Sequence, residues 1–268
     1  MTQALRHFLL ALQFFTRIPV TGRLAAWVGY SPAMLRASAV HFPAVGWLVG
    51  GLSGGVFLAL CWALPPLPAS PWVAAALSTV FSVLLTGAFH EDGLADLADG
   101  LGGSLDRERA LDIMKDSRIG SYGALALVLC VASKLALLVL LAQHSVALAG
   151  AALFGAHVSS RLLPLWVMHR QPHVGDTPRS KSKPLADAMG GWALLRASQW
   201  WWPALLVLYV LQPQAPWWQA MLLAALGMSW VARLLRRRLG GFTGDGLGTV
   251  QQVSEAAFYL GLALGLPA

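Results

Sequence analysis

Three aspartates follow one another in the segment 90–100, which reads His-Glu-Asp-Gly-Leu-Ala-Asp-Leu-Ala-Asp-Gly. Asp92, Asp96 and Asp99 are four and three residues apart, so on an α-helix their side chains fall within roughly 60° of one face. Carboxylates stacked in this way repel one another unless a cation lies among them. Oxygen ligands without a Cys or His cluster favour Mg²⁺ or Mn²⁺ over zinc. The spacing therefore predicts a metal-binding helix face, and the alternative is a solvated acidic loop.

A second group of charged residues follows in the run Lys115-Asp116-Ser117-Arg118. Cations beside a metal site suggest an anionic substrate, and phosphate suits Lys and Arg best. The alternative is that these two cations only balance the neighbouring carboxylates.

A third group surrounds Asp245, which lies among five glycines between Gly240 and Gly248. Such a turn can present backbone N–H groups to an anion, although a flexible connector has the same composition. Together the three groups describe a phosphoryl-transfer site. A carboxylate-held metal neutralises a pyrophosphate, Lys and Arg hold the leaving phosphate, and a further carboxylate takes a proton.

The elements that must position these residues are apolar. The chain is 57% hydrophobic and only 12% charged, about half the charged fraction of a soluble domain. Residues 37–89 and 197–232 carry no Asp, Glu, Lys or Arg, and residues 119–160 carry only Lys134. Since a span needs roughly 20 apolar residues, we predict an all-α, polytopic transmembrane helical bundle that forms a single catalytic domain over residues 1–268.

Six to seven spans are expected, preceded by an interfacial amphipathic helix over residues 3–18. The spans are predicted at 43–63, 71–89, 120–142, 146–168, 191–211 and 217–235. A seventh segment, 249–267, is ambiguous because its apolar part is too short. It reaches span length only if Gln251, Gln252, Ser254 and Glu255 face protein.

Basic residues alternate with the hairpin tips along the chain. Sixteen of the 19 Lys and Arg residues fall in four segments, namely the N-terminus to Arg36, 107–118, 170–183 and 233–238, and the three tips carry none. This pattern makes the basic segments cytoplasmic and suits an anionic lipid leaflet. The distribution argues against nucleic acid as the partner. It also places the acidic segment, the Lys115–Arg118 run and the turn around Asp245 on the cytoplasmic side. Residues 177–184 are predicted to be a mobile basic loop.

One charge lies within each of the predicted third and fourth spans, Lys134 and Arg161, with His157 one turn before Arg161. Intramembrane charges face the bundle interior by default. They could bind an anionic ligand or pair with Glu255. The two cysteines, Cys61 and Cys130, are expected to be packing residues and not a disulfide.

The acidic segment and the run from Met114 to Gly123 resemble the cobalamin synthase family, also called adenosylcobinamide-GDP ribazoletransferases. Further stretches match that family in order and spacing: 15–20, 41–46, Ser160-Arg161 and 240–245. The resemblance implies a Mg²⁺-dependent enzyme of the bacterial inner membrane that acts late in cobalamin biosynthesis. It would join adenosylcobinamide-GDP to α-ribazole or α-ribazole 5′-phosphate, giving adenosylcobalamin or its 5′-phosphate and GMP. Association with other corrinoid-assembly enzymes is a further hypothesis.

The resemblance also implies roles for individual residues. Asp92, Asp96 and Asp99 would ligate Mg²⁺, and Asp245 would complete the metal site or act as the base. Lys115 and Arg118 would stabilise the departing GMP phosphate. The residues expected to bind substrate are Asp116 and Ser117, with Arg17, His41 and Arg161 at the polar edges of the ribazole and corrin pockets. Glu91 stands where the family has an aliphatic residue, so we expect it to support the site without touching the metal.

Two other functions use similar residues. A CDP-alcohol phosphotransferase also spaces aspartates around Mg²⁺, but Asp96 stands where that motif has Arg. A divalent-cation transporter could use the same three aspartates, although transporter sites usually lie near the bilayer midplane. This cluster begins where a predicted span ends.

Overall fold

The computed structural model describes residues 2–174 and 189–267. The predicted basic loop 177–184, with Arg179, Lys181 and Lys183, lies outside the described residues. Within them the chain is helical, and the one β-type contact is an isolated bridge between His173 and Phe242. The all-α prediction is confirmed.

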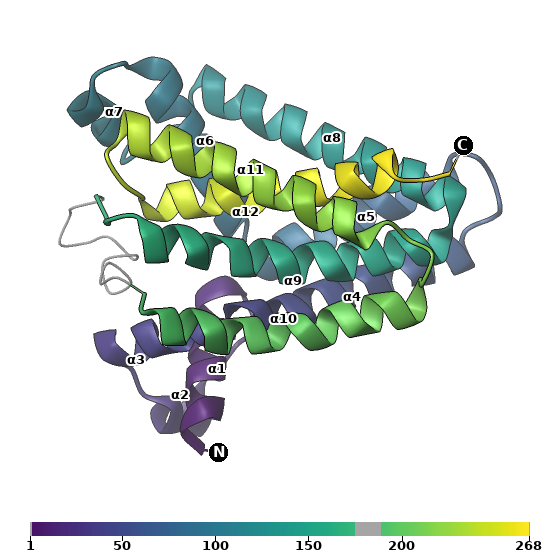
Figure 1. Ribbon diagram of the computed structural model, residues 1–268, viewed down its shortest axis with the longest axis horizontal. Helices are drawn as coiled ribbons and strands as arrows, with labels where there is room; N and C mark the ends of the chain where they lie inside the picture. The colour runs from purple at the N-terminus through teal and green to yellow at the C-terminus, as the bar shows by residue number, and fades with distance from the viewer. Residues whose placement is uncertain (1, 175–188, 268) are drawn as a thin grey trace.

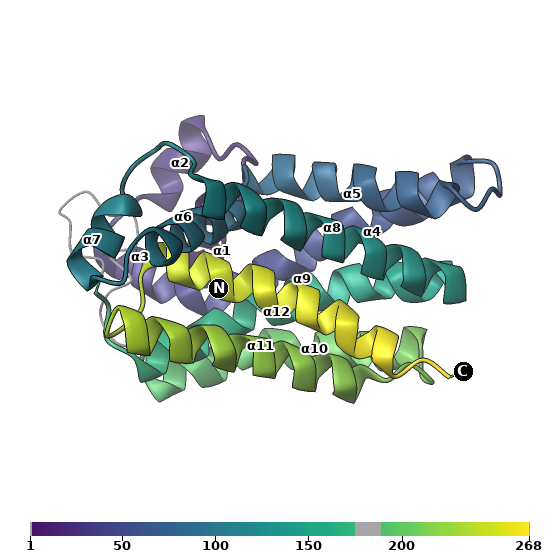
Figure 2. The same ribbon diagram turned by 90° about the horizontal axis from the view of Figure 1, so that it is seen from above.

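Long helices run side by side in the bundle that Figures 1 and 2 show from two directions. These are α4 (Phe42–Ala63), α5 (Ser70–Thr86), α8 (Ser121–His144), α9 (Val146–Arg170), α10 (Gly191–Leu211), α11 (Trp217–Arg238) and α12 (Gly244–Leu264). Three shorter helices precede them, α1 (Thr2–Phe15), α2 (Gly22–Val28) and α3 (Pro32–Ser38), and a 3₁₀ turn at Ala39–His41 leads into α4. Two more, α6 (Phe89–Gly103) and α7 (Arg107–Ile113), lie between α5 and α8.

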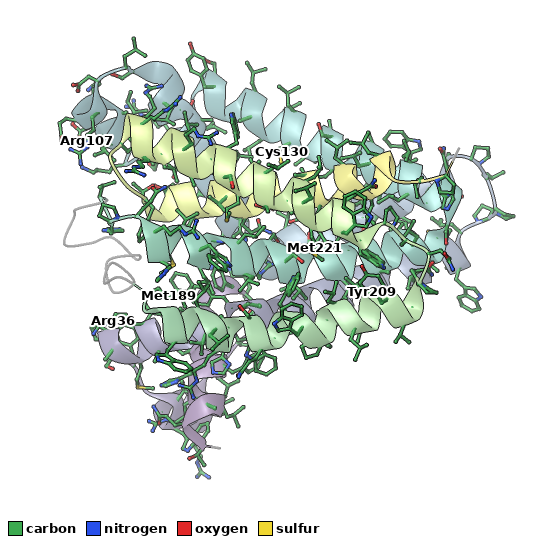
Figure 3. All side chains as sticks on the ribbon, in the orientation of Figure 1. Arg36, Arg107, Cys130, Met189, Tyr209 and Met221 are labelled. Atoms are coloured by element: carbon green, nitrogen blue, oxygen red, sulfur yellow. The ribbon has the colours of Figure 1, made fainter. Side chains whose placement is uncertain are left out.

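The two ends of the bundle differ in chemistry. Helix α7, the α11–α12 turn and α3 lie at one end, and the α4–α5, α8–α9 and α10–α11 connections lie at the other (Figure 1). Figure 3 shows Arg107 at the first end and Cys130 part-way along α8. The described basic segments and the hairpin tips thus separate as the charge pattern predicts. Both cysteines are free.

Glycines on α4 bring α9 into backbone contact. Gly46, Gly50 and Gly54 follow one another every fourth residue, so they share one face of α4. A Cβ atom on Gly50 would lie 2.9 Å from the Phe154 backbone, and one on Gly54 would lie 2.9 Å from the Gly150 carbonyl oxygen. Small residues at this spacing allow helices in a membrane to pack closely. As a result α9 is buried along most of its length, and its polar side chains face the bundle interior.

Length and apolarity alone identify four candidate spans, Pro32–Ala63, Ser121–His144, Val146–Arg170 and Trp217–Arg238, and a fifth if α5 and α6 count as one bent pair. This count is lower than the six to seven expected. Helices α10 and α12 have span length, but the first contains Arg196, Pro203 and several Trp residues, and the second carries a polar face. Four polar residues of α12 are buried against protein, namely Gln251, Gln252, Ser254 and Glu255. The ambiguous segment 249–267 therefore meets the condition for reaching span length.

Candidate active site

A sharp bend between α5 and α6 sets the direction of the acidic helix. The two helices meet at 89°, and the turn consists of Gly87 and Ala88, which both adopt the left-handed conformation (φ 65° and 58°). Left-handed backbone is easy for Gly and uncommon for Ala. The Arg17 side chain packs over Gly87, and the Arg17 backbone N–H donates to the Leu85 carbonyl at 2.7 Å. Because of this bend, α6 does not continue the direction of α5, and its carboxylates lie at the end of the bundle.

Helices α6 and α12 cross in close contact at two glycines. A Cβ on Gly93 would lie 2.9 Å from the Asp245 carbonyl oxygen and 3.0 Å from its Cα, and one on Gly248 would lie 3.3 Å from the His90 carbonyl oxygen. The Thr249 hydroxyl, buried in this crossing, donates to the carbonyl oxygens of Gly93 at 3.1 Å and Asp245 at 3.0 Å. The crossing brings the first turn of α12 onto the acidic face of α6.

Three carboxylates consequently influence one another. Asp92 is exposed, whereas Asp96 and Asp245 are half-buried. Burial and the negative charges of Asp245, Asp92 and Asp99 raise the pKa of Asp96 to about 7. Burial and Asp92 raise the pKa of Asp245 to about 6. Burial contributes most to both shifts, and the neighbouring negative charges add to it.

The carboxylates do not form a closed coordination shell. Across residues 2–174 and 189–267, no three Asp, Glu, His or Cys side chains are placed to enclose a metal ion. The donor set, hard oxygens with unneutralised charge, nevertheless suits a divalent cation such as Mg²⁺. The predicted ligands Asp92, Asp96 and Asp245 therefore share one region, and metal binding by them stays a prediction.

Asp99 has a different environment. It is buried, and its two carboxylate oxygens accept the backbone N–H groups of Gly120 at 2.7 Å and Gly123 at 2.8 Å. These N–H groups open α8, so Asp99 caps that helix from a neighbouring element. Asp99 thereby fastens the end of the Lys115–Arg118 loop to α6, a contact that the three-aspartate spacing did not reveal.

Within that loop the cations pair locally. Lys115 lies 3.2 Å from Asp112, and Arg118 lies 2.6 Å from Asp116. The Arg118 hydrogen bonds lower the pKa of Asp116 to about 2. Ser117 is exposed. Lys115 and Arg118 are also exposed, so their long side chains are accessible to a phosphate at the same end of the bundle.

Sequence reasoning missed a cap at the other end of α6. The Arg238 guanidinium donates to the carbonyl oxygens of Leu101 at 3.2 Å and Ser104 at 2.6 Å. Arg107 likewise donates to the Leu239 carbonyl at 2.7 Å. The sequence analysis assigned both arginines only to the positive-inside pattern. The carbonyl acceptors lie more than 130 residues from each arginine in the chain, so no local pattern could indicate these contacts.

Arg161 and Lys134 belong to a buried polar network beneath α6. Lys134 lies 2.8 Å from Glu255, while Arg161 contacts His157 through Nδ1 and the carbonyl oxygen, both at 3.0 Å. Lys134 thus pairs with Glu255, which was one of the two alternatives that the sequence left open.

Gln252 connects this network to the acidic helix. It donates to Glu91 at 3.0 Å and accepts from Lys134 at 3.3 Å. Glu91 therefore points into the bundle, away from the exposed Asp92. Its supporting role stays a prediction.

His41 does not join the acidic region. It lies in the 3₁₀ turn before α4 and lines a separate hollow with residues of α1 and α10. The sequence analysis predicted three residues at the polar edges of the substrate pockets, and the structure places them in three separate regions. Arg17 lies at the α5–α6 bend, Arg161 in the buried network and His41 in the hollow.

Comparisons with known proteins agree with one of the three functions considered. A family model described as cobalamin-5-phosphate synthase matches residues 7–263. Curated relatives named adenosylcobinamide-GDP ribazoletransferase include those of Polaromonas naphthalenivorans, 55% identical over 99% of this chain and 100% of its own, and Albidiferax ferrireducens, 56% identical over the same shares. The relative from Leptothrix cholodnii is 45% identical over 97% and 96%.

No solved structure matches the chain. The family model and the relatives cover the acidic segment, the Lys115–Arg118 loop and Asp245 in one alignment, and they favour neither the CDP-alcohol phosphotransferase nor the cation transporter. The chain belongs to the cobalamin-5-phosphate synthase family.

Proposed function

We propose that the chain is an adenosylcobinamide-GDP ribazoletransferase. The ribose 3′-hydroxyl of α-ribazole, or of α-ribazole 5′-phosphate, attacks the phosphorus attached to cobinamide. The new P–O bond joins the two parts, the bond to the GMP oxygen breaks, and the hydroxyl proton passes to a carboxylate. The products are adenosylcobalamin, or its 5′-phosphate, and GMP.

The observation that supports this function best is the crossing of α6 and α12. Gly93 and Gly248 allow two backbones to touch, and so the carboxylates of Asp92, Asp96 and Asp245 gather from separate parts of the chain. Phosphoryl transfer depends mainly on positioning and on charge stabilisation. A region rich in unneutralised carboxylate beside exposed Lys and Arg offers both.

Mg²⁺, or Mn²⁺ in its place, would be held by Asp92, Asp96 and Asp245, where it would neutralise the pyrophosphate. Asp99 holds the start of α8 and with it the loop of Lys115 and Arg118. Those two cations bind the phosphate of the departing GMP, and Asp116 orients Arg118 through the ion pair. Asp245 either completes the metal site or takes the proton of the attacking hydroxyl.

The same proposal places the chain in the bacterial inner membrane, with the acidic end of the bundle facing the cytoplasm. The basic segments that the structure describes lie at that end, as the positive-inside pattern requires. GDP-activated cobinamide is then available from the cytoplasmic side, where other corrinoid-assembly enzymes could associate.

Release of GMP tests the proposal directly. The purified chain in liposomes receives adenosylcobinamide-GDP, α-ribazole phosphate and Mg²⁺, and GMP is measured with each component omitted in turn. We expect GMP only when all three are present, and at least a 100-fold lower rate for Asp96→Asn. Glu108→Gln is the matched control, since Glu108 is an exposed carboxylate at the same end of the bundle.

That control should keep the parental rate. A folded parental chain that released no GMP from both substrates would refute the transferase, whatever the variants did.

A further inference from the structure

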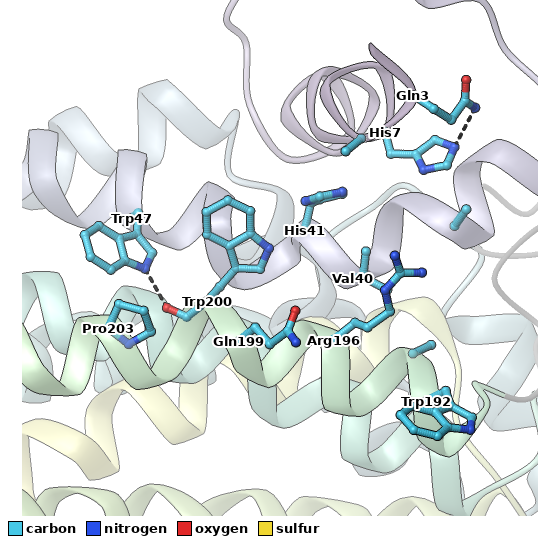
Figure 4. A pocket seen from close by; sticks show the side chains of 13 residues that line it. Gln3, His7, Val40, His41, Trp47, Trp192, Arg196, Gln199, Trp200 and Pro203 are labelled. Carbon is cyan, nitrogen blue, oxygen red and sulfur yellow. Dashed lines mark hydrogen bonds between the residues drawn. The ribbon is translucent and has the colours of Figure 1, made fainter. Parts of the chain in front are cut away.

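The hollow lined by His41 lies apart from the acidic region. It is bounded by α1, the 3₁₀ turn, the start of α4 and α10. It encloses about 960 Å³, and Figure 4 shows the side chains that line it. Neither the carboxylates of α6 nor the Lys115–Arg118 loop contribute to it. No residue to which the transfer proposal assigns a role at the metal or the phosphate lines it.

One end of the hollow is polar. His41 is 8% exposed, and its Nδ1 atom is buried without a hydrogen-bond partner among the described residues. Figure 4 shows His41, His7 and Arg196 directed toward one common space. The Arg196 side chain is exposed and makes no hydrogen bond or ion pair within the part of the chain that the structure describes. An unsatisfied buried imidazole nitrogen is costly unless a ligand completes it.

The other end is aromatic and lies deeper along α10. Trp47 donates its indole N–H to the Trp200 backbone carbonyl oxygen at 2.8 Å, which holds the Trp47 indole against α10. The Trp200 indole and Pro203 line the same end of the hollow (Figure 4). Pro203 follows Arg196 by seven residues, or about 10 Å along the helix. The hollow thus changes from polar to apolar over the thickness of one lipid interface.

Among the described residues that line the hollow, Arg196 is the only one with a formal charge. The first acidic residue of the chain is Glu91, and α10 contains none. Helix α1 and the segment up to α4 contribute only Arg residues to the formal charge. A ligand held there by Arg196 and the two histidines would be anionic.

We propose that this hollow binds an anionic phospholipid of the surrounding bilayer. Its phosphate lies against Arg196, His41 and His7, and an acyl chain lies along Trp47 and Trp200. A free phosphate shares the first set of contacts but leaves the aromatic end without a partner. Exposed indoles on the same helix, at Trp192 and Trp202, mark α10 as a helix in contact with the interface.

Quenching of tryptophan fluorescence by brominated lipid tests the proposal. The full chain in neutral detergent is titrated with phosphatidylglycerol carrying brominated acyl chains, and with phosphatidylcholine carrying the same chains. We expect a saturable component with phosphatidylglycerol only, and a smaller amplitude of that component in Trp47→Phe, in which Trp200 remains. Arg196→Gln should weaken the apparent affinity about 10-fold, in line with the loss of one charge-assisted contact.

Arg237→Gln is the matched control, because Arg237 is an exposed arginine outside the hollow and its substitution changes the net charge equally. His41→Asn is the second variant, and it should also weaken binding. GMP release by Arg196→Gln should stay at the parental rate, which shows that this variant is folded.

Three results would overturn the lipid assignment. Equal quenching by the two lipids would show an apolar groove without preference for an anion. Displacement of the lipid by inorganic phosphate or α-ribazole phosphate at comparable concentration would show a site for a soluble phosphate. Equal affinities in Arg196→Gln and Arg237→Gln would show attraction by net charge only. GMP release by the parental chain depends on none of these results, so the two proposals fail separately.

Discussion

Asp99 and Asp96 are one turn apart on α6, yet they lie in opposite environments. Both oxygens of Asp99 accept backbone N–H groups of the α8 start, whereas Asp96 faces other carboxylates. A buried carboxylate with two charge-assisted hydrogen bonds stabilises the fold. A half-buried carboxylate among like charges opposes it. Neighbouring aspartates of one motif therefore serve stability and chemistry separately.

Substitution should separate these two roles. We expect Asp99→Ala to lower the free energy of unfolding by about 1–2 kcal/mol, as the loss of a helix cap does. Asp96→Asn should leave stability unchanged or raise it, because it removes repulsion, while it abolishes GMP release. Thermal unfolding of both variants in the same detergent, without metal, is the measurement. A larger loss of stability in Asp96→Asn than in Asp99→Ala would contradict this division.

The raised pKa values of Asp96 and Asp245 predict how pH affects metal binding. A carboxyl whose pKa in the folded state exceeds its unfolded value destabilises the fold once it ionises. The metal-free protein should therefore lose stability as the pH rises through about 6 and about 7. A bound cation removes the repulsion among the ionised groups.

Stabilisation by Mg²⁺ should accordingly be larger at about pH 8 than at about pH 5.5, where protons compete for the ligands. The measurement is the thermal midpoint with Mg²⁺ minus that with EDTA, at each pH. A difference that is constant or falls with pH would show that these carboxylates do not hold the ion.

Among the contacts between helices, the close crossing of α6 and α12 is the one on which the acidic site depends. A Cβ on Gly93 would meet backbone atoms of Asp245, and backbone cannot move aside as a side chain can. Gly93→Ala should push the helices apart and cost about 1–3 kcal/mol of stability. It should lower GMP release more than Gly55→Ala, which places its methyl group on an exposed face of α4 with no atom within 4 Å.

Thermal unfolding and GMP release of the two variants check this. If both variants lose stability and GMP release to the same extent, the loss comes from replacing glycine with alanine in a helix and not from the crossing.

The sequence could predict the helices and the charged segments, because apolar length and charge placement are local properties. It also anticipated that the polar face of 249–267 would turn toward protein. It could not predict that Gly87 and Ala88 would turn α6 by 89°, because nothing in Ala88 itself favours a left-handed backbone. Nor could it separate Asp99 from the other aspartates, since its partners, Gly120 and Gly123, are more than 20 residues away.

For the whole molecule, the arrangement of helices predicts the side of the C-terminus. Helix α12 begins at the acidic end, and the C-terminus lies at the opposite end, near the hairpin tips (Figure 1). With the acidic end in the cytoplasm, the C-terminus is on the periplasmic side. Alkaline phosphatase fused after the last residue should be active, whereas the same enzyme fused after Gly240, at the end of α11, should be inactive. The reverse pattern would invert the proposed orientation.

The buried polar face of α12 also bears on how the molecule is made. Gln251, Gln252 and Glu255 have partners on α6, α8 and α9, so this helix is poorly suited to enter lipid by itself. It also follows α6, α8 and α9 in the chain, so these partners have been synthesised before it. Since α12 carries Asp245, a nascent chain has no complete acidic site until this helix has been made, and assembly of the bundle and assembly of the site are one event.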